Sequence, residues 1–378
     1  MLAVFPLDWS RPETHGLVEK SLALVAAARS TGLHVDAAFA QARDIRIIRG
    51  DCALPPLPSP RAYGRINAHA AALYRYRGFW RALRPYVASG RYDSVWVRAF
   101  PVGDAQLALL QEVAASPTAL VYDVPTYPVA LERIGGLAGW VRSRAYPLDV
   151  VAPLADRFVT LSPDPTILGT PCLNVSNGVE VPEAGPPAQA SPGADCIVGL
   201  GQWADWHGVD RLIEGLTIAQ PRTRPTVHLA GRGPAVGGLL ALAQARGVQL
   251  TAGPPVFGDA RARLLGSGTV GLGCLGIHRK EGFPDRALKH RTYAAYGLPF
   301  VATPADDAWD DCPAVLQVPS DDEPLDPRVL GDFIARARAK RASWAAELKG
   351  RARSLSWRYT YAPLWGYLRT QSRGSYPT

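Results

Sequence analysis

The stretch HRKEGFPDRALKHRTYAAYGLPFVATP, residues 278–304, carries the most informative pattern in the chain. A helix-like segment ends in Gly-Leu-Pro, and the apolar run PFVAT follows it as a strand, so a short turn joins the two. His278, Arg279, Lys280 and Lys289 bring positive charge to the start of this helix, where unpaired backbone N–H groups already favour an anion. The stretch therefore predicts either a diphosphate site or a solvated basic loop in front of a core helix.

Short apolar runs alternate with helix-like segments on both sides of this stretch. Strands are expected at residues 1–7, 34–40, 94–100, 118–124, 157–162, 196–203, 226–231, 248–253, 269–275 and 299–303, and helices at 16–32, 61–91, 209–220, 285–297 and twice within 327–370. Alternation of this kind predicts an α/β fold of doubly wound parallel sheets.

One segment interrupts the alternation. PEAGPPAQASPG combines proline, glycine and alanine in a way that cannot build a core element, so it predicts a linker. The expected organisation is an N-terminal domain over 1–182, a linker over 183–194, a C-terminal domain over 195–355 and a last helix over 356–378 that packs back on the first domain. Ligands of such folds bind at the carboxyl ends of the strands.

The composition is that of a folded protein. The chain has 378 residues, of which 47% are hydrophobic and 20% charged, which is enough for two domains that each bury a core. Its five cysteines include no CxxC pair, which argues against a disulfide framework or a zinc knuckle and favours a reducing compartment. Without a leader-like N-terminus or an apolar run of ~18 residues, the expectation is a cytoplasmic protein.

The net charge narrows the choice of partners. Lysine and arginine number 41 against 33 acidic residues, which gives +8 and suits anionic substrates or an anionic membrane surface. The basic, aromatic stretch over residues 74–84 is a candidate for lying on the inner face of a membrane. We expect no nucleic-acid partner, because no recognition-helix motif and no basic run that would bind nucleic acid occurs.

Four motifs, in order along the chain, resemble those of GT-B glycosyltransferases, especially the family 4-like enzymes that assemble bacterial capsular polysaccharides and exopolysaccharides. They are YDVPTYP (122–128), NGV (177–179), GQWADWHGVDRLIEGL (201–216) and, within 278–304, HRK with Leu288, Lys289, Tyr293, Ala295, Gly297, Pro299, Phe300 and Val301. The resemblance implies two Rossmann-like domains that face each other across a cleft. It also implies transfer of a sugar from a nucleotide diphosphate-sugar to a hydroxyl of a glycan or lipid-linked glycan.

The resemblance assigns roles to particular residues. Lys289 and Arg279 would stabilise the departing diphosphate, since positive charge aimed at its oxygens lowers the barrier. Asp123, at the end of a strand, and His15, on the loop after the first strand, would face the sugar and the acceptor, although Asp123 also fits a simple turn cap. The other donor-binding candidates are Gly16, Gln202, His207, Arg232, Gly233, His278, Lys280 and Thr292, and the acceptor-side candidates are Glu13, Thr126 and Tyr127.

Three positions depart from the family pattern. Thr292 stands where a glutamate usually binds the ribose, and a hydroxyl cannot take both ribose hydroxyls as a carboxylate does. Gln202 and His207 stand where related enzymes carry arginine and lysine. Glu281 lies too far upstream of Thr292 to be the equivalent acid. These departures keep a second hypothesis open, a non-catalytic GT-B-like partner subunit or glycan-binding protein.

Other chemistries find little support in the sequence. It holds no D-x-D triplet, no H-x3-H pair, no G-x-G-x-x-G after the first strand and no P-loop, so we expect neither a metal nor a cofactor. Acid pairs at 306–307, 310–311 and 321–323 are expected to be solvated. The family analogy predicts retention of the anomeric configuration without a protein base. An epimerase would need two cleft carboxylates, and no such pair is identifiable.

Overall fold

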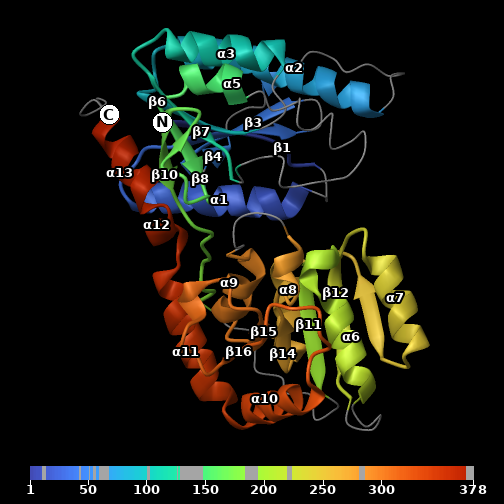
Figure 1. The fold of residues 1–378 in the computed structure, drawn as a ribbon. Helices are drawn as coiled ribbons and strands as arrows, with labels where there is room; N and C mark the ends of the chain where they lie inside the picture. The colour runs from blue at the N-terminus through green and yellow to red at the C-terminus, as the bar shows by residue number, and fades with distance from the viewer. Residues whose placement is uncertain are drawn as a thin grey trace. The chain divides into compact units, whose positions relative to one another are not determined.

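The computed structural model describes residues 1–10, 14–41, 44–50, 52–53, 57–58, 68–99, 103–125, 127, 148–183, 195–218, 224–280 and 286–371. The chain forms two compact units (Figure 1). The N-terminal unit consists of Met1–Ser176 and Thr360–Thr378, and the C-terminal unit of Asn177–Tyr359. The last part of the chain thus returns to the unit in which the chain begins.

The N-terminal unit is built on one mixed sheet in the order β4-β3-β2-β1-β6-β7-β8-β10-β9, with β5 paired to β3. Its elements are β1 (Leu2–Asp8), α1 (His15–Ser30), β2 (Asp36–Gln41), β3 (Asp44–Arg49), β4 (Cys52–Ala53), β5 (Leu57–Pro58), α2 (Ala68–Ala88), β6 (Ser94–Arg98), α3 (Asp104–Ala114), β7 (Ala119–Asp123), α5 (Leu148–Val151), η3 (Ala152–Leu154), β8 (Arg157–Thr160), β9 (Thr166–Ile167), β10 (Thr170–Asn174) and α13 (Ala362–Gln371). Strands β2, β1, β6, β7, β8 and β10 run parallel, while β3 and β9 add antiparallel edges.

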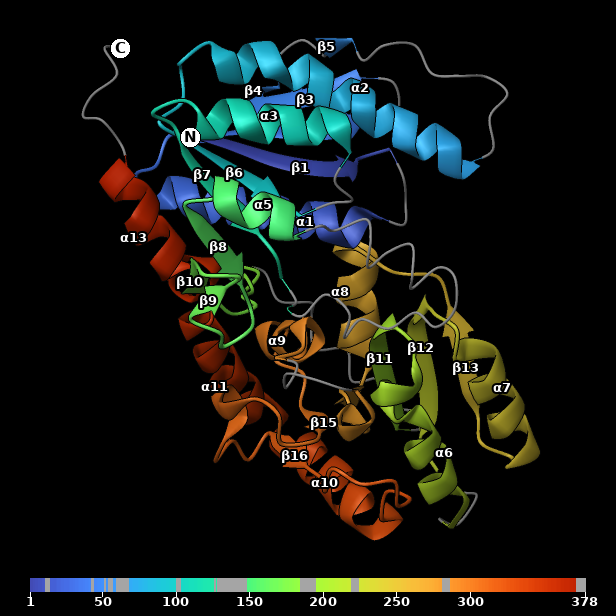
Figure 2. The same ribbon diagram turned by 45° about the horizontal axis from the view of Figure 1, so that its top comes forward.

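Helices cover both faces of this sheet (Figure 2). On one face, Leu2 and Val4 of β1 pack in a cluster with residues of α2 and α3. On the other face, Phe5 and Trp96 contact each other, and Trp96 packs edge-on against Trp365 of α13, with ring centroids 5.9 Å apart. The continuously apolar strands are explained by this double cover, since both faces of each strand are buried.

The C-terminal unit has a six-stranded, wholly parallel sheet in the order β13-β12-β11-β14-β15-β16. Its elements are β11 (Cys196–Gln202), η4 (Asp205–His207), α6 (Val209–Ile218), β12 (Thr226–Arg232), α7 (Val236–Ala245), β13 (Leu250–Gly253), α8 (Gly258–Ser267), β14 (Val270–Leu272), η6 (Ile277–Arg279), α9 (Leu288–Ala295), β15 (Phe300–Ala302), η7 (Asp307–Trp309), β16 (Val315–Gln317), α10 (Pro327–Ala339) and α11 (Arg341–Ser354), followed by α12 (Trp357–Thr360) at the boundary of the two units. Counted within the unit, the strand order is 3-2-1-4-5-6, which is that of the doubly wound dinucleotide-binding fold.

The expected α/β class is confirmed, and the differences from the predicted elements have local causes. Strand β3 pairs antiparallel to β2 and alternates buried and accessible residues, a pattern that the search for continuous apolar runs overlooks. The tail expected to form two helical segments forms four helices, α10 to α13, which are separated at residues 340, 355–356 and 361. Most of the predicted linker, residues 184–194, lies outside the described residues.

None of the helices within the described ranges is long and apolar enough to span a membrane.

Candidate functional site

The strand order of the C-terminal unit determines where a ligand site is expected. Strands β11 and β14 are neighbours, but the strands that follow them in the chain, β12 and β15, lie on opposite sides of this pair. Crevices at such switch points, outside the carboxyl ends of the strands, are the usual ligand sites of doubly wound folds. Here Tyr293 of α9 bridges the two strands where they separate: its hydroxyl donates to the Leu272 carbonyl at 2.8 Å and accepts from the Leu200 N–H at 2.9 Å.

Glycines allow two strand ends to approach each other closely. Gly231 (φ +138°) and Gly233 (φ +156°) have backbone conformations that side-chain-bearing residues rarely adopt. A Cβ on Gly231 would overlap the carbonyl oxygen of Gly201, and one on Gly233 would overlap the backbone of Trp203. The glycines of LAGRGP therefore build the turn, and Gly233 is required by packing whether or not it also contacts a ligand.

Lys289, Trp203 and His207 converge beside Gly201, and we call these four residues the Lys289 cluster. The Lys289 Nζ is inaccessible to solvent and lies 4.6 Å from the ring centroid of Trp203. A Cβ built on Gly201 would be 3.2 Å from this Nζ and 3.6 Å from the His207 Nε2. The first turn of α9 and the connection from β11 to α6 thus bring an ammonium and an imidazole together at the carboxyl end of β11.

His207 is a neutral member of the cluster. Its side chain is 7% exposed, and the Ala204 N–H donates to its Nδ1 at 3.0 Å, so the proton of the neutral ring resides on Nε2. Burial, reinforced by the charge of Lys289, lowers the pKa of His207 to about 2. The ring therefore offers an uncharged N–H donor across the physiological pH range, next to a cationic lysine.

His290 supports the neighbouring strand end. Its Nε2 accepts from the Cys274 N–H at 3.1 Å, just beyond β14, and its ring stacks on Phe300 with centroids 5.2 Å apart. Burial, followed by the charges of Lys289 and Arg291, lowers the pKa of His290 to about 3. Sequence reasoning missed this residue, and its only signal was its position next to Lys289 at the start of a predicted helix.

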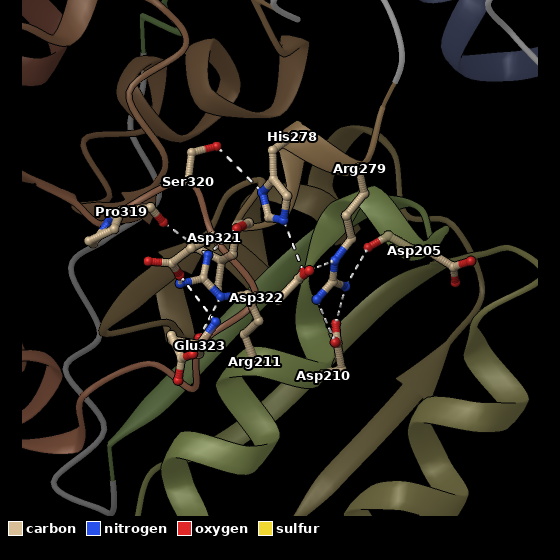
Figure 3. Close-up of polar contacts among 11 residues, drawn as sticks. Asp205, Asp210, Arg211, His278, Arg279, Pro319, Ser320, Asp321, Asp322 and Glu323 are labelled. Carbon is tan, nitrogen blue, oxygen red and sulfur yellow. Dashed lines mark hydrogen bonds and ion pairs between the residues drawn. The ribbon is translucent and has the colours of Figure 1, made fainter.

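Arg279 is engaged by carboxylates of its own unit (Figure 3). Its Nη1 and Nη2 each lie 2.8 Å from a carboxylate oxygen of Asp210, and its Nε donates to Asp322 at 2.6 Å. These bonds, with that to Asp210 the largest contribution, raise the pKa of Arg279. His278 shares Asp322 at 2.9 Å. The charges of Arg279 and His278 are therefore paired with acids of the same unit.

Most of the acids expected to be solvated are exposed, namely Asp307, Asp310, Asp311, Asp322 and Glu323, but two acids of these segments bind enclosed arginines. Asp321 pairs with Arg211, a fully enclosed side chain that also donates to the carbonyls of Leu275, Pro319 and Glu323 (Figure 3). Asp306 is 6% exposed and pairs with Arg291. The prediction was wrong for Asp306, which is buried because α9 brings Arg291 against its loop.

The remaining donor-side candidates have more accessible positions. Gln202 and Arg232 are exposed neighbours at the ends of β11 and β12. Thr292 donates its hydroxyl to the Leu288 carbonyl at 3.0 Å, within its own helix. Lys280 is half-buried at the end of η6, and its charge contributes to the lowered pKa of His207.

The candidates in the N-terminal unit lie at the carboxyl ends of its strands or just after them. His15 and Gly16 are the first two residues of α1, and both are partly accessible. Asp123 is 1% exposed and bonded to Arg98 across β6 and β7 at 3.0 Å. The Tyr127 carbonyl accepts from Ser162 at 3.3 Å. Glu13 and Thr126, like Glu281, lie outside the described residues.

Arg98 is a further residue that sequence reasoning missed. Its guanidinium lies at the end of β6 and is 15% exposed, beside the almost inaccessible carboxylate of Asp123. A buried carboxylate is stable only when it is paired, so Asp123 and Arg98 depend on each other.

As to metals, no group of three or more His, Cys, Asp or Glu side chains suited to hold an ion occurs in the described parts of the chain.

Comparison with known proteins gives a fold but no close relative. No protein-family model matches the chain, and the search of curated proteins gave no match. HepE of Anabaena, solved in complex with UDP and glucose, aligns with a TM-score of 0.61 at 12% identity over 98% of this chain and 100% of that one. Trehalose-6-phosphate synthase OtsA aligns with a TM-score of 0.60 at 12% identity, over 97% of this chain and 98% of that one. The chain has the GT-B fold.

A third structure agrees with this assignment. The lipopolysaccharide outer core galactosyltransferase WaaB aligns with a TM-score of 0.52 at 11% identity over 98% of this chain and 99% of that one. Likeness at such low identity establishes the architecture and leaves the chemistry to the residues of this chain.

Proposed function

We propose that this GT-B protein is a glycosyltransferase whose C-terminal unit binds a nucleotide diphosphate-sugar. The observation that carries the proposal is the Lys289 cluster: an ammonium and a neutral imidazole N–H converge beside Gly201, at the switch point of a doubly wound sheet. Two N–H donors close to the same glycine suit the oxygens of a diphosphate. Several similar structures point the same way, since HepE is described with UDP and glucose and GtfA with UDP and GlcNAc.

The chemistry follows from the leaving group. As the sugar departs, negative charge grows on the diphosphate, and a cation held beside it stabilises the transition state more than the ground state. Lys289 would supply that charge, and His207 would add a hydrogen bond without changing charge with pH. We assign Arg279 a positioning role, because its guanidinium is already bound by Asp210 and Asp322.

The finer parts of the proposal rest on the sequence resemblance. They are retention of configuration, independence of metal ions, a glycan or lipid-linked glycan acceptor in polysaccharide assembly, and action in the cytoplasm at the inner face of a membrane. On the acceptor side, His15 and Tyr127 are the described candidates, and Asp123 would act by holding Arg98.

The alternative is a GT-B-like protein that binds without catalysis. It is favoured by Thr292, whose hydroxyl bonds within its own helix, and by the exposed amide of Gln202 where related enzymes carry a cation. The two hypotheses differ in turnover.

One experiment separates these functions. Thermal shift is measured with UDP, ADP, GDP and TDP, and donor hydrolysis is then followed with the corresponding nucleotide-sugars. Stabilisation by one diphosphate together with hydrolysis of its sugar supports the transferase. Stabilisation without turnover, also in the presence of glycan acceptors, favours the binding protein, and no response to any nucleotide rejects the donor site.

A further inference from the structure

Trp203, the first residue after β11, contributes the uncharged aromatic side chain of the Lys289 cluster. Its side chain is fully buried, and the Lys289 Nζ lies 4.6 Å from its ring centroid. Its ring also meets the ring of His207 edge-on, with centroids 5.2 Å apart and an interplanar angle of 64°. One indole thus contacts both of the groups that would bind a diphosphate.

Glycines on two strands make room for this indole. A Cβ on Gly199 would come within 2.5 Å of the Trp203 ring, and one on Gly231 within 3.2 Å of its Nε1. On Gly233 a Cβ would overlap the Trp203 backbone. A larger residue at Gly199 would displace the ring, whereas one at Gly231 or Gly233 would clash with the backbone of Gly201 or Trp203.

An aromatic face holds a cation differently from a carboxylate. The electron-rich face of an indole attracts an ammonium, most strongly where water is excluded, but it carries no net charge. It therefore fixes the position of the Lys289 ammonium without cancelling its charge. Arg279 illustrates the opposite case, because Asp210 and Asp322 offset its charge.

We propose that Trp203 is a positioning residue for Lys289. Its indole face holds the ammonium in position, and its ring contacts His207. The two N–H groups are thus already placed beside Gly201 before a nucleotide-sugar binds. The contact itself is independent of any ligand, whereas its consequence for turnover rests on the proposed function.

The test changes the electron density of the ring and leaves its shape almost intact. Tetrafluorotryptophan is incorporated at position 203, and Trp203→Phe and Trp203→Leu are compared with it. The matched control carries tetrafluorotryptophan at Trp344, which is 4% exposed in the same unit and stacks on Phe333. The first readout is the rate at which an acylating reagent modifies Lys289, measured by mass spectrometry on the intact, ligand-free protein.

With tetrafluorotryptophan at position 203, modification of Lys289 should become about tenfold faster, because the electron-poor ring no longer attracts the ammonium. Trp203→Phe should stay within about threefold of the wild type, and the Trp344 control should not differ from it. The second readout is donor turnover, where kcat/KM should fall about tenfold with fluorine at 203 and recover in Trp203→Phe.

The outcomes are distinct. An unchanged rate of Lys289 modification with fluorine at position 203 overturns the proposal, and so does an equal change in the Trp344 control. If modification accelerates as expected but the wild-type protein binds no nucleoside diphosphate, Trp203 positions Lys289 as proposed, and the proposed function fails. If Trp203→Leu does not fold, the fluorinated protein still decides, since its ring fills the same space.

Discussion

Lys289 and Arg279 carry the same charge but have different surroundings. Arg279 has three nitrogens committed to the carboxylates of Asp210 and Asp322. Lys289 lies on the face of Trp203 and close to the neutral ring of His207, among other contacts. A motif that contains several basic residues therefore does not say which of them meets an anion, since that depends on which acids reach them first.

Substitution of Lys289 tests the phosphate assignment at the residue scale. Lys289→Ala should lower donor turnover by ~10²-fold or more, because a preorganised donor to the leaving group is removed. Steady-state kinetics measure the effect, and circular dichroism checks the fold. Lys349→Ala on α11 is the control and should leave turnover unchanged. Wild-type kinetics in Lys289→Ala would contradict the assignment.

His290 predicts how stability depends on pH. Its pKa is about 3 in the folded protein and near 6.5 when unfolded, so below pH 6.5 the unfolded state binds the proton first. The stability that the neutral ring contributes is complete above pH 6.5 and is lost as the pH falls toward 3, by up to ~1.4 kcal/mol per pH unit.

Urea unfolding between pH 7.5 and 4.5 measures this loss. His290→Gln keeps an acceptor for the Cys274 N–H but does not titrate. Its unfolding free energy should therefore fall less steeply as the pH is lowered, and the difference in slope should correspond to about one proton taken up on unfolding. His34→Gln, at an accessible position before β2, is the control and should retain the wild-type slope. Parallel slopes for His290→Gln and the wild type would show that His290 is not buried as described.

At the scale of one element, α9 combines several tasks in eight residues. Lys289 belongs to the proposed donor site, His290 binds the segment just beyond β14, and Tyr293 bridges β14 and β11. Arg291 anchors the helix through Asp306 and through the Asn177 carbonyl at 2.5 Å. The helix is thus held on three sides, so the Lys289 backbone is rigidly placed.

Breaking the Arg291–Asp306 pair should strongly destabilise the C-terminal unit. Both side chains are almost fully buried, and Asp306 also accepts from the Trp309 indole at 3.0 Å, so Asp306→Ala leaves a buried charge without its partner. The expected loss is about 3 to 5 kcal/mol of unfolding free energy, measured by urea denaturation.

Two comparisons show whether burial causes this effect. Arg291→Met with Asp306→Leu should cost clearly less than the two single substitutions together, because no lone charge remains. Glu214→Ala removes a partner of Arg246, which is 51% exposed, and should cost at most ~1 kcal/mol. Equal losses for Asp306→Ala and Glu214→Ala would be inconsistent with a buried pair.

At the scale of the whole molecule, the chain passes from one unit to the other twice, at residues 176–177 and 359–360. Helix α13 therefore belongs to the N-terminal unit, where Trp365 is 1% exposed and packs against Trp96 and Tyr361. Each unit has its own hydrophobic core, and such units can unfold as separate cooperative steps.

Calorimetry should assign a transition to each unit. Trp365→Ala should lower the unfolding temperature of the N-terminal unit, since loss of a buried tryptophan costs about 3 to 5 kcal/mol. The nucleoside diphosphate found by thermal shift should raise the unfolding temperature of the C-terminal unit only. At 100 times its Kd it should add ~2.7 kcal/mol to the unfolding free energy of that unit. Tyr359→Ala, at a 61% exposed position, is the control and should change neither transition. If the diphosphate instead raised the transition that Trp365→Ala lowers, it would bind the N-terminal unit, contrary to the proposed function.

The sequence alone determined the fold class and most of the central strands. Apolar runs such as residues 196–203 and 226–231 become β11 and β12, because strands buried on both faces need apolar side chains throughout. It also determined that Lys289 lies at the start of a helix and His207 just after a strand. These are local properties, which the pattern of neighbouring residues is sufficient to predict.

Only the tertiary structure decided which of the predicted site residues meet. Lys289 reaches Trp203 and His207 across more than eighty positions of sequence, whereas Arg279 and Arg291 are bound by Asp322 and Asp306 from loops that the sequence presents as solvated. The physical reason is that charge pairing and burial depend on distance in space and on the exclusion of water. Both are fixed by the order in which strands assemble into a sheet, and neither is encoded in the spacing of residues along the chain.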